Sequence, residues 1–504
     1  MKTYNIKPGL EEFSLAREQF AKIIAFLTSD SAQQLDHGNI EEKIMKEGWE
    51  ILRRLLQGHL DLRANQEQKS NSIKTSSGML LTQCRTGCKR KLESLFGEVT
   101  VKRMSYKQRG EESIFPLDSD LNLPVGKYSH GLQKLVAEES SKTSFDEVVK
   151  TIKKLTGGKV PKRQAEELTP VVSSDFDKYY TQKKIESIEN NEDILVMSTD
   201  GKGIVMREDS LREATKKAAK RKKKEGPQLT RLKPGEKPNR KRMSTVVTVY
   251  TVAPYERTPK DIMAKPDESK KSIRPRPENK RIFASLQKDP DEVISEMFEE
   301  GERRDPKHLK KRVVLVDGAK HQLDLINNCI KRYNVEVSVI LDFIHVLEYL
   351  WKAAHCFFDV GSEEAEKWVQ ERALKILQGK SSSVASGMRR SATMRKLKKS
   401  QRKGIDKCAN YLLKYKSYLH YDKYLLAGFP IASGVIEGAC RYLVKDRMDL
   451  TGARWGLRDA EAVLKLRALR ASGDFDDYWK FHCDEELKRN YKTHCNEYEF
   501  KNAA

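Results

Sequence analysis

The order of hydrophobic and polar positions predicts a helical start followed by a strand. Apolar residues recur at helical spacing in 20–27 and 40–62, so the first ninety or so residues are expected to be helical. Segment 95–106 alternates apolar and polar residues at period two, which predicts a strand that opens a small hairpin. Three helical segments then follow at short spacing, at 129–140, 144–155 and 160–179. Their tight Gly-Gly link predicts a trihelical, helix-turn-helix-like module.

Strand patterns dominate the middle of the chain. Two apolar runs, 194–200 and 313–317, each end at an aspartate followed by glycine, and 244–253 and 335–341 are further expected strands. With the intervening helices, the order is strand, strand, helix, strand, helix, strand, helix. Residues 258–290 are expected to be a Pro- and Lys-rich connector.

These patterns predict an α/β protein with a mixed-sheet core and a mainly helical N-terminal region. The expected domains are a helical region at 1–95, a hairpin with a helix-turn-helix-like module at 96–190, a first core part at 191–358 with a basic loop at 207–243, a helical insertion at 359–428, and the core completion with C-terminal helices at 429–504.

Three carboxylates stand in settings suited to phosphoryl transfer. Asp200 and Asp317 are expected at strand ends, and Ser433 can cap a helix that carries Glu437 in its first turns. Such acids can converge on a pair of Mg²⁺ ions about 3.5–4 Å apart, with Mn²⁺ as a substitute. A single Asp-Gly is more often an ordinary turn, so the hypothesis depends on all three carboxylates meeting in one fold.

Five stretches in this region resemble the transposases of Kra-type bacterial insertion sequences. They are 198–203, 316–320, 341–351, 434–441 and 451–455. The resemblance runs from about Phe96 to Phe481 and implies a DDE transposase with an RNase H-like core, similar in layout to Mutator-like transposases. It also implies metal-dependent DNA cleavage and strand transfer through Asp200, Asp317 and Glu437, and an all-helical insertion before the glutamate helix.

Asp342 and His345 are accessory candidates at a spacing of three residues. The resemblance extends to them, because Mutator-like transposases carry a Cys or Asp followed by His after the second catalytic aspartate. A structural hydrogen bond, direct contact with DNA or metal, and no role at all remain open for this pair.

Charge favours a polyanionic partner. The 504 residues include 96 Lys and Arg against 73 Asp and Glu, a formal net charge of +23. Double-stranded DNA is the expected partner, with a homodimer or higher oligomer acting on paired ends. The basic tracts 212–242 and 389–403 can contact phosphates or be solvated, and the first can also be a targeting signal. The candidate DNA contacts are Arg163, Gln164, Lys222, Arg389, Arg390, Arg441, Arg454 and Trp455, although a tryptophan in a turn is more often a core anchor.

Three further points concern the membrane, the cysteines and the alternatives to a transposase. No apolar run approaches the roughly 20 residues that span a bilayer, which predicts a cytoplasmic, nucleoid-associated protein without membrane contact. Cys84 and Cys88 offer half a zinc site or free thiols on a basic helix. Two alternatives to a transposase are a nuclease of the same fold that does not transfer strands and a domesticated, non-catalytic DNA-binding protein.

Overall fold

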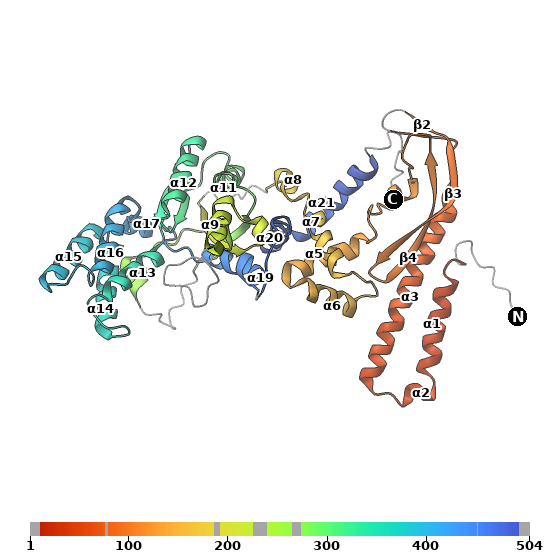
Figure 1. Cartoon of the computed structure of the whole chain (residues 1–504), viewed down its shortest axis with the longest axis horizontal. Helices are drawn as coiled ribbons and strands as arrows, with labels where there is room; N and C mark the ends of the chain where they lie inside the picture. The colour runs from red at the N-terminus through yellow and green to blue at the C-terminus, as the bar shows by residue number, and fades with distance from the viewer. Residues whose placement is uncertain are drawn as a thin grey trace. The chain divides into compact units, whose positions relative to one another are not determined.

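The computed structural model describes residues 11–75, 79–185, 192–224, 239–264, 274–450 and 452–492. The chain divides into two compact units, Met1–Gln182 with Asp474–Ala504, and Lys183–Gly473. Helices and a five-stranded mixed sheet make it an α/β protein, as predicted (Figure 1). None of the helices within the described ranges has both the length and the apolar character needed to cross a bilayer.

The first unit begins with a helical hairpin. Its elements are α1 (Ser14–Leu27), the short α2 (Asp30–Gln33) and α3 (His37–Gln66). Asp36 caps α3 by accepting a 2.8 Å hydrogen bond from the amide of Asn39. The contacts of Arg54 with the carbonyl of Leu15 and of Asn65 with Glu12 show that α1 and α3 run antiparallel.

Strands occupy the end of the region that was predicted to be helical. The short strands β1 (Ile73–Lys74) and β2 (Leu80–Leu81) form one pair. The antiparallel pair β3 (Gln83–Ser94) and β4 (Gly97–Lys107) spans the boundary predicted at residue 95 between the helical region and the hairpin. The predicted strand therefore closes the hairpin instead of opening it, and Cys84 and Cys88 lie on a strand, not on a helix. Most side chains of β3 are exposed or half-buried, so its sequence carries no apolar alternation that would predict a strand.

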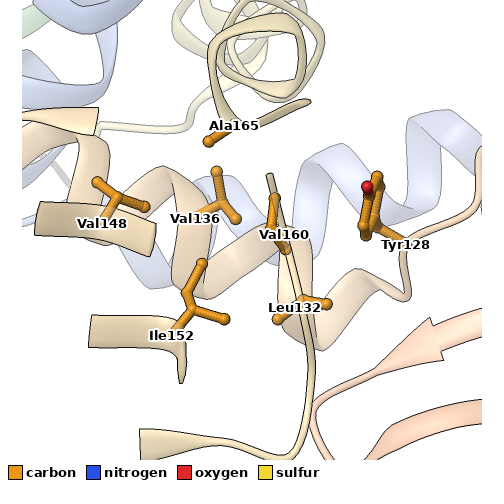
Figure 2. Close-up of a cluster of buried hydrophobic side chains, with 7 residues drawn as sticks. All are labelled: Tyr128, Leu132, Val136, Val148, Ile152, Val160 and Ala165. Carbon is orange, nitrogen blue, oxygen red and sulfur yellow. The ribbon is translucent and has the colours of Figure 1, made fainter. Parts of the chain in front are cut away.

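A small helical core follows the hairpin. Its helices are α4 (Pro116–Asp120), α5 (His130–Lys142), α6 (Phe145–Leu155), α7 (Lys162–Val172) and α8 (Phe176–Gln182). Ser129 and Ser144 cap α5 and α6 with their hydroxyls. Figure 2 shows Leu132, Val136, Val148, Ile152 and Ala165 converging with Tyr128 and Val160. The predicted helix 160–179 is divided in two, α7 and α8, and Pro170 lies inside α7.

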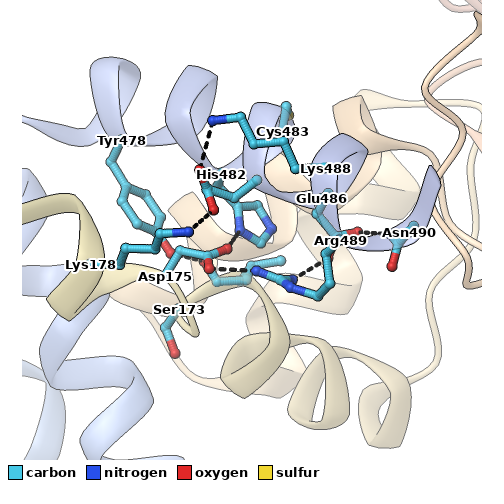
Figure 3. A network of polar contacts seen from close by, with 12 residues as sticks. Ser173, Asp175, Lys178, Tyr478, His482, Cys483, Glu486, Lys488, Arg489 and Asn490 are labelled. Carbon is cyan, nitrogen blue, oxygen red and sulfur yellow. Dashed lines mark hydrogen bonds and ion pairs between the residues drawn. The ribbon is translucent and has the colours of Figure 1, made fainter. Parts of the chain in front are cut away.

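The last described helices pack in this first unit. They are α21 (Phe475–Leu487) and the π-helical η4 (Lys488–Lys492). In Figure 3 the carboxylate of Asp175 is held by His482 Nδ1 at 2.7 Å and by Arg489. Tyr478 donates to the carbonyl of Val172 at 2.7 Å. The range 429–504, expected to hold the core completion and the C-terminal helices, therefore divides between the two units, with Asp474–Ala504 in the first.

A five-stranded mixed sheet forms the core of the second unit. Its strands are β5 (Ile194–Val205), β6 (Lys241–Val252), β7 (Glu278–Ser285), β8 (Arg312–Val316) and β9 (Ser338–Leu341). The order is β7-β6-β5-β8-β9, with β5, β6 and β7 antiparallel and β5, β8 and β9 parallel. Strand β7 lies in the range predicted to be a connector, because its first half is polar and only its second half is buried.

Helices connect these strands and fill the predicted helical block. The first set is α9 (Glu213–Lys224), α10 (Pro259–Met263), α11 (Pro290–Arg304), α12 (Lys320–Tyr333) and α13 (Phe343–Ala354), with the short η1 (Glu208–Ser210). The second set is α14 (Glu363–Leu377), α15 (Ser381–Met394), α16 (Lys403–Lys414), η2 (Lys416–Tyr418), α17 (Tyr421–Leu426), α18 (Gly434–Ala439), the π-helical η3 (Cys440–Lys445), α19 (Asp446–Met448) and α20 (Leu457–Ala471). The basic insert between β5 and β6 begins as helix α9, not as a loop, and 225–238 lie outside the described residues.

Candidate metal centre and active site

Three aspartates share one level of the sheet. Ser198 of β5 pairs with Leu315 of β8, so continuing this parallel register by two residues brings Asp200 beside Asp317. Val316 pairs with Leu341 of β9, and the next position in register brings Asp317 beside Asp342. Residues at one level of adjacent parallel strands direct their side chains to the same face. Continued past the ends of β8 and β9, the register sets Asp200, Asp317 and Asp342 at one level of the sheet edge.

Asp200 does not end its strand, contrary to the prediction. Strand β5 continues to Val205 because its antiparallel partner β6 extends to Lys241, whereas the parallel partner β8 stops at Val316. Asp200 thus lies where the parallel pairing ends, and its side chain is half-buried. Its Oδ2 accepts a hydrogen bond from Cys440 Sγ at 3.2 Å.

The buried thiol of Cys440 connects Asp200 to the glutamate helix. Burial and the neighbouring charge of Asp200 raise the pKa of Cys440, so the thiol stays protonated and acts as the donor. Cys440 follows Glu437 by three residues, which puts both on one side of a helix. Sequence reasoning missed this contact, although the spacing of the two residues was visible.

Asp317 follows β8 directly and is half-buried. Its Oδ1 accepts a hydrogen bond from the amide of Ala319 at 2.8 Å. Gly318 adopts a φ of +91°, a conformation that L side chains rarely take, so the glycine after the aspartate is required by the turn.

Asp342 is fully buried and makes several hydrogen bonds. It caps α13 by accepting from the amide of Ile344 at 3.0 Å, and its Oδ2 lies 3.0 Å from His345 Nδ1 and 2.6 Å from the Ser433 hydroxyl. Burial raises the pKa of Asp342, but the hydrogen bonds from His345 and Ser433 outweigh burial and lower it overall. The hydrogen bond to Asp342 raises the pKa of His345 to about 9 against the opposing effect of burial. The two side chains form an ion pair at neutral pH.

Glu437 completes a group that could hold a metal ion. Within the described ranges, Asp342, His345 and Glu437 form the group of three potential ligands whose atoms all lie within 4.8 Å of one another. The Ser433 hydroxyl donates to Asp342 and lies 3.4 Å from Glu437 Oε1. Ser433 precedes α18 as predicted but makes no side-chain cap, since its hydroxyl is used by Asp342.

Asp200, Asp317 and Glu437 do not form such a group among the residues that the structure describes. Helix α18 thus brings Glu437 to Asp342 and His345, while the strand register brings Asp200 and Asp317 to the same sheet edge.

Tyrosines of the helical insertion fix the backbone beside these acids. Tyr411 donates to the carbonyl of Asp317 at 3.1 Å, Tyr415 to that of Gly318 at 2.5 Å, and Tyr421 to that of Leu341 at 2.7 Å. We call these three side chains the tyrosine clamp. The insertion therefore positions the chain at the ends of β8 and β9, and no pattern in the sequence indicated this role.

The structure contradicts one expected DNA contact. Trp455 is 7% exposed, its indole donates to the carbonyl of Met448 at 3.0 Å, and the guanidinium of Arg447 lies 4.8 Å from its ring centre. Its faces are therefore used by the protein core and cannot stack on a base. Arg454 beside it is exposed.

The other expected DNA contacts are mostly at the surface. Arg390 is exposed, and the side chain of Arg441 is 79% exposed. Arg389 is half-buried and donates to Asn410. Arg163 and Gln164 of α7 both bind Glu167, at 2.9 and 2.6 Å, so reading bases would require them to leave this partner. Lys222 lies in α9, and its side chain is outside the described residues.

Cys84 and Cys88 are free thiols on β3. Cys88 Sγ contacts the Ser105 hydroxyl at 3.4 Å, and the described residues supply no third ligand that would group with the two cysteines.

No protein-family model matches the chain, and no curated protein matches it either.

Proposed function

We propose that this chain is a DNA transposase of the insertion-sequence type, which cleaves and joins DNA in a metal-dependent reaction at the edge of an RNase H-like core. The observation that carries the proposal is the position of three aspartates at one sheet edge: Asp200 on β5, Asp317 directly after β8 and Asp342 directly after β9, with Glu437 reaching Asp342.

The topology of the sheet supports an RNase H-like core. Three antiparallel strands come first in the chain, and two parallel strands follow, each reached through a helix, in the order β7-β6-β5-β8-β9. Because β7 lies inside the expected connector, the sheet has five strands, and its order agrees with an RNase H-like core more closely than the four strands predicted from the sequence. A helical block between β9 and the glutamate helix agrees with the layout of the families that the sequence resembles.

The residue types at this sheet edge suit a hard divalent cation. Asp200, Asp317 and Glu437 offer carboxylate oxygens, the ligands that Mg²⁺ and Mn²⁺ prefer. Bound ions would activate the attacking oxygen and stabilise the leaving one. His345 is a poor ligand while it is protonated, because both ring nitrogens then carry hydrogen.

The protein's own groups have separate tasks in this proposal. Asp342 holds the charged imidazole of His345, which is 34% exposed and can donate its second N–H to a phosphate oxygen. Cys440 orients Asp200, and the tyrosine clamp fixes the backbone at Asp317. Such chemistry proceeds by positioning and charge without a covalent protein intermediate.

The substrate in this proposal is double-stranded DNA. The net charge of +23 supports a polyanion, and Arg390, Arg441 and Arg454 are exposed contacts for phosphates. Binding through phosphates should weaken steeply with salt, with a log-log slope of roughly −0.9 per contact on duplex DNA.

The direct test uses the purified full chain with DNA fragments taken from either side of its coding sequence. Mg²⁺-dependent nicking at defined ends, followed by joining of the 3′ ends to a second DNA, is the expected result. Cleavage without joining would favour the nuclease alternative, and binding without either reaction would favour the non-catalytic alternative.

A further inference from the structure

A cleft of about 1090 Å³ opens in the first unit, between α3 and the segment that joins α6 to α7. The turn between β3 and β4 lines it as well, with Phe96 at the tip of the turn. Tyr128, a member of the helical core in Figure 2, forms another part of the wall. Every lining residue belongs to the first unit, and the proposed active site uses none of them.

Hydrogen bonds hold the walls of the cleft together. The amide of Gly157 donates to the carbonyl of Leu95 at 2.9 Å, and Arg53 of α3 donates to the carbonyl of Glu98 at 3.4 Å. An added Cβ at Gly157 would lie 2.3 Å from the carbonyl oxygen of Phe96, so the close approach of these two segments requires glycine. The β3–β4 turn is therefore fixed on both sides, and a ligand would meet a cleft that is already formed, which lowers the cost of binding.

The lysines of the cleft are available to an anion, because most of the acids beside them are already engaged. Three acids of the lining have basic partners at 2.7–2.9 Å: Glu47 with Lys43, Glu50 with Arg53 and Arg54, and Glu98 with Lys91. Within the described ranges, five lysines of the lining form no ion pair: Lys46, Lys127, Lys153, Lys154 and Lys159. Even with the charges of Glu42 and the buried Glu93 counted, the cleft keeps an excess of positive charge.

Two aromatic rings accompany these lysines. Trp49 of α3 and Phe96 of the β3–β4 turn stack with their ring centres 6.1 Å apart, and both side chains are half-buried residues of the lining. An unpaired base presents a flat face that stacks on such rings whatever its sequence, and lysines beside the rings bind the phosphates of the same strand. In a duplex the faces of the bases are covered by their neighbours. The combination of rings and lysines therefore favours a single strand over a duplex.

We propose that this cleft binds a single strand of nucleic acid, with an unpaired base on the pair of Trp49 and Phe96 and the neighbouring phosphates on the five lysines. The volume of the cleft reaches the upper limit of small-ligand sites, roughly 300–1,000 Å³, so a strand fits it better than a lone mononucleotide. The inference does not depend on the proposed activity, because such binding needs neither a metal ion nor the acids at the sheet edge.

Binding of labelled oligodeoxythymidine to the full chain, measured by fluorescence anisotropy without added metal, tests the role of the rings. Trp49→Ala should raise the dissociation constant roughly tenfold or more, because it removes a stacked base. Trp49→Phe keeps an aromatic ring and should recover most of the affinity. An oligomer of the same length with abasic sugars offers phosphates and no bases, so Trp49→Ala and the unaltered chain should bind it equally.

Two lysines of α6 provide a matched pair for the role of the charges. Lys154 lines the cleft, whereas Lys150 lies outside the lining and pairs with Glu147 at 2.7 Å. Each phosphate contact on a single strand adds roughly −0.7 to the slope of log affinity against log salt. Lys154→Ala should therefore make the slope for oligodeoxythymidine shallower by about 0.7, and Lys150→Ala should leave the slope unchanged.

Several results would overturn the proposal. Unchanged affinity for oligodeoxythymidine in Trp49→Ala is one, and an equal effect of Lys154→Ala and Lys150→Ala on the salt slope is another. An equal loss of affinity for the normal and the abasic oligomer in Trp49→Ala would leave that tryptophan a structural role alone. Displacement of the labelled oligomer by polyglutamate as readily as by unlabelled oligodeoxythymidine would assign the cleft to an acidic protein segment instead.

Discussion

The Asp342–His345 pair makes a prediction about pH at the scale of single residues. The hydrogen bond to Asp342 raises the pKa of His345 to about 9. A raised folded-state pKa means that the pair's contribution to stability is complete below the unfolded pKa of about 6.5 and is lost as pH rises through about 9. In an NMR titration of the metal-free chain, His345 should therefore still be protonated at neutral pH.

Asp342→Asn is the companion variant for this titration. It should return the pKa of His345 toward its ordinary value and cost about 1–2 kcal/mol, a modest loss because the imidazole is partly exposed. Titration of His345 near 6.5 in the unaltered chain would contradict the pairing.

Trp455 and Arg454 are neighbours with opposite predicted roles. Trp455→Ala should destabilise the protein by about 3–5 kcal/mol, since it empties a core position, while leaving the DNA affinity of the folded fraction unchanged. Arg454→Ala should leave the unfolding midpoint unchanged and weaken DNA binding. Denaturant unfolding and a DNA titration of both variants decide the matter. Loss of DNA affinity in a folded Trp455 variant would restore the stacking role.

At the scale of elements, the helical insertion is predicted to support the active site through hydroxyl groups. Tyr411→Phe and Tyr421→Phe each remove one hydrogen bond to a strand-end carbonyl and should cost about 1 kcal/mol. They should lower the rate of DNA cleavage while leaving DNA affinity unchanged, because they shift Asp317 and Asp342 and not the DNA-binding surface. Tyr418→Phe, outside the clamp, is the control. Equal cleavage rates in all three variants would show that the tyrosine clamp does not contribute to cleavage.

The last helix is predicted to be part of the first unit's fold. A chain ending at Gly473 lacks α21 and with it the contacts of His482 and Arg489 with Asp175. Hydrogen exchange should then show lost protection in α5 and α8, while β5 and β8 of the second unit keep theirs. Unchanged protection in α8 would show that the first unit folds without α21. A test of DNA recognition should accordingly use the full chain and not an N-terminal fragment.

At the scale of the whole molecule, the sequence predicted elements with strong periodicity and missed those without it. The helices around Leu132 and Val148 and the buried strands containing Val196 and Val314 carry their apolar residues at the positions that the structure buries. Strand β3 was missed because most of its face is exposed, and β7 because its first half is polar. The membership of α21 in the first unit depends on contacts over about 300 residues, which no local pattern encodes.

The acids of the candidate site could be predicted from the sequence, but the residues that hold them by hydrogen bonds could not. Asp200, Asp317 and Glu437 stand in recognisable motifs, and Asp342–His345 in a recognisable spacing. Cys440, Ser433 and the tyrosine clamp act through hydrogen bonds between segments distant in sequence. Cysteine, serine and tyrosine are common residues, so their composition gave no signal before the fold was known.

The central claim is that the row of acids at the sheet edge performs metal-dependent DNA cleavage. The most direct measurement compares cleavage and binding of the flanking DNA fragments by the unaltered chain, Asp317→Asn and Asp324→Asn at matched Mg²⁺. Asp324 is an exposed acid on α12, outside the row. The account predicts that Asp317→Asn abolishes cleavage and keeps binding, while Asp324→Asn changes neither. Cleavage by Asp317→Asn at the unaltered rate would contradict it.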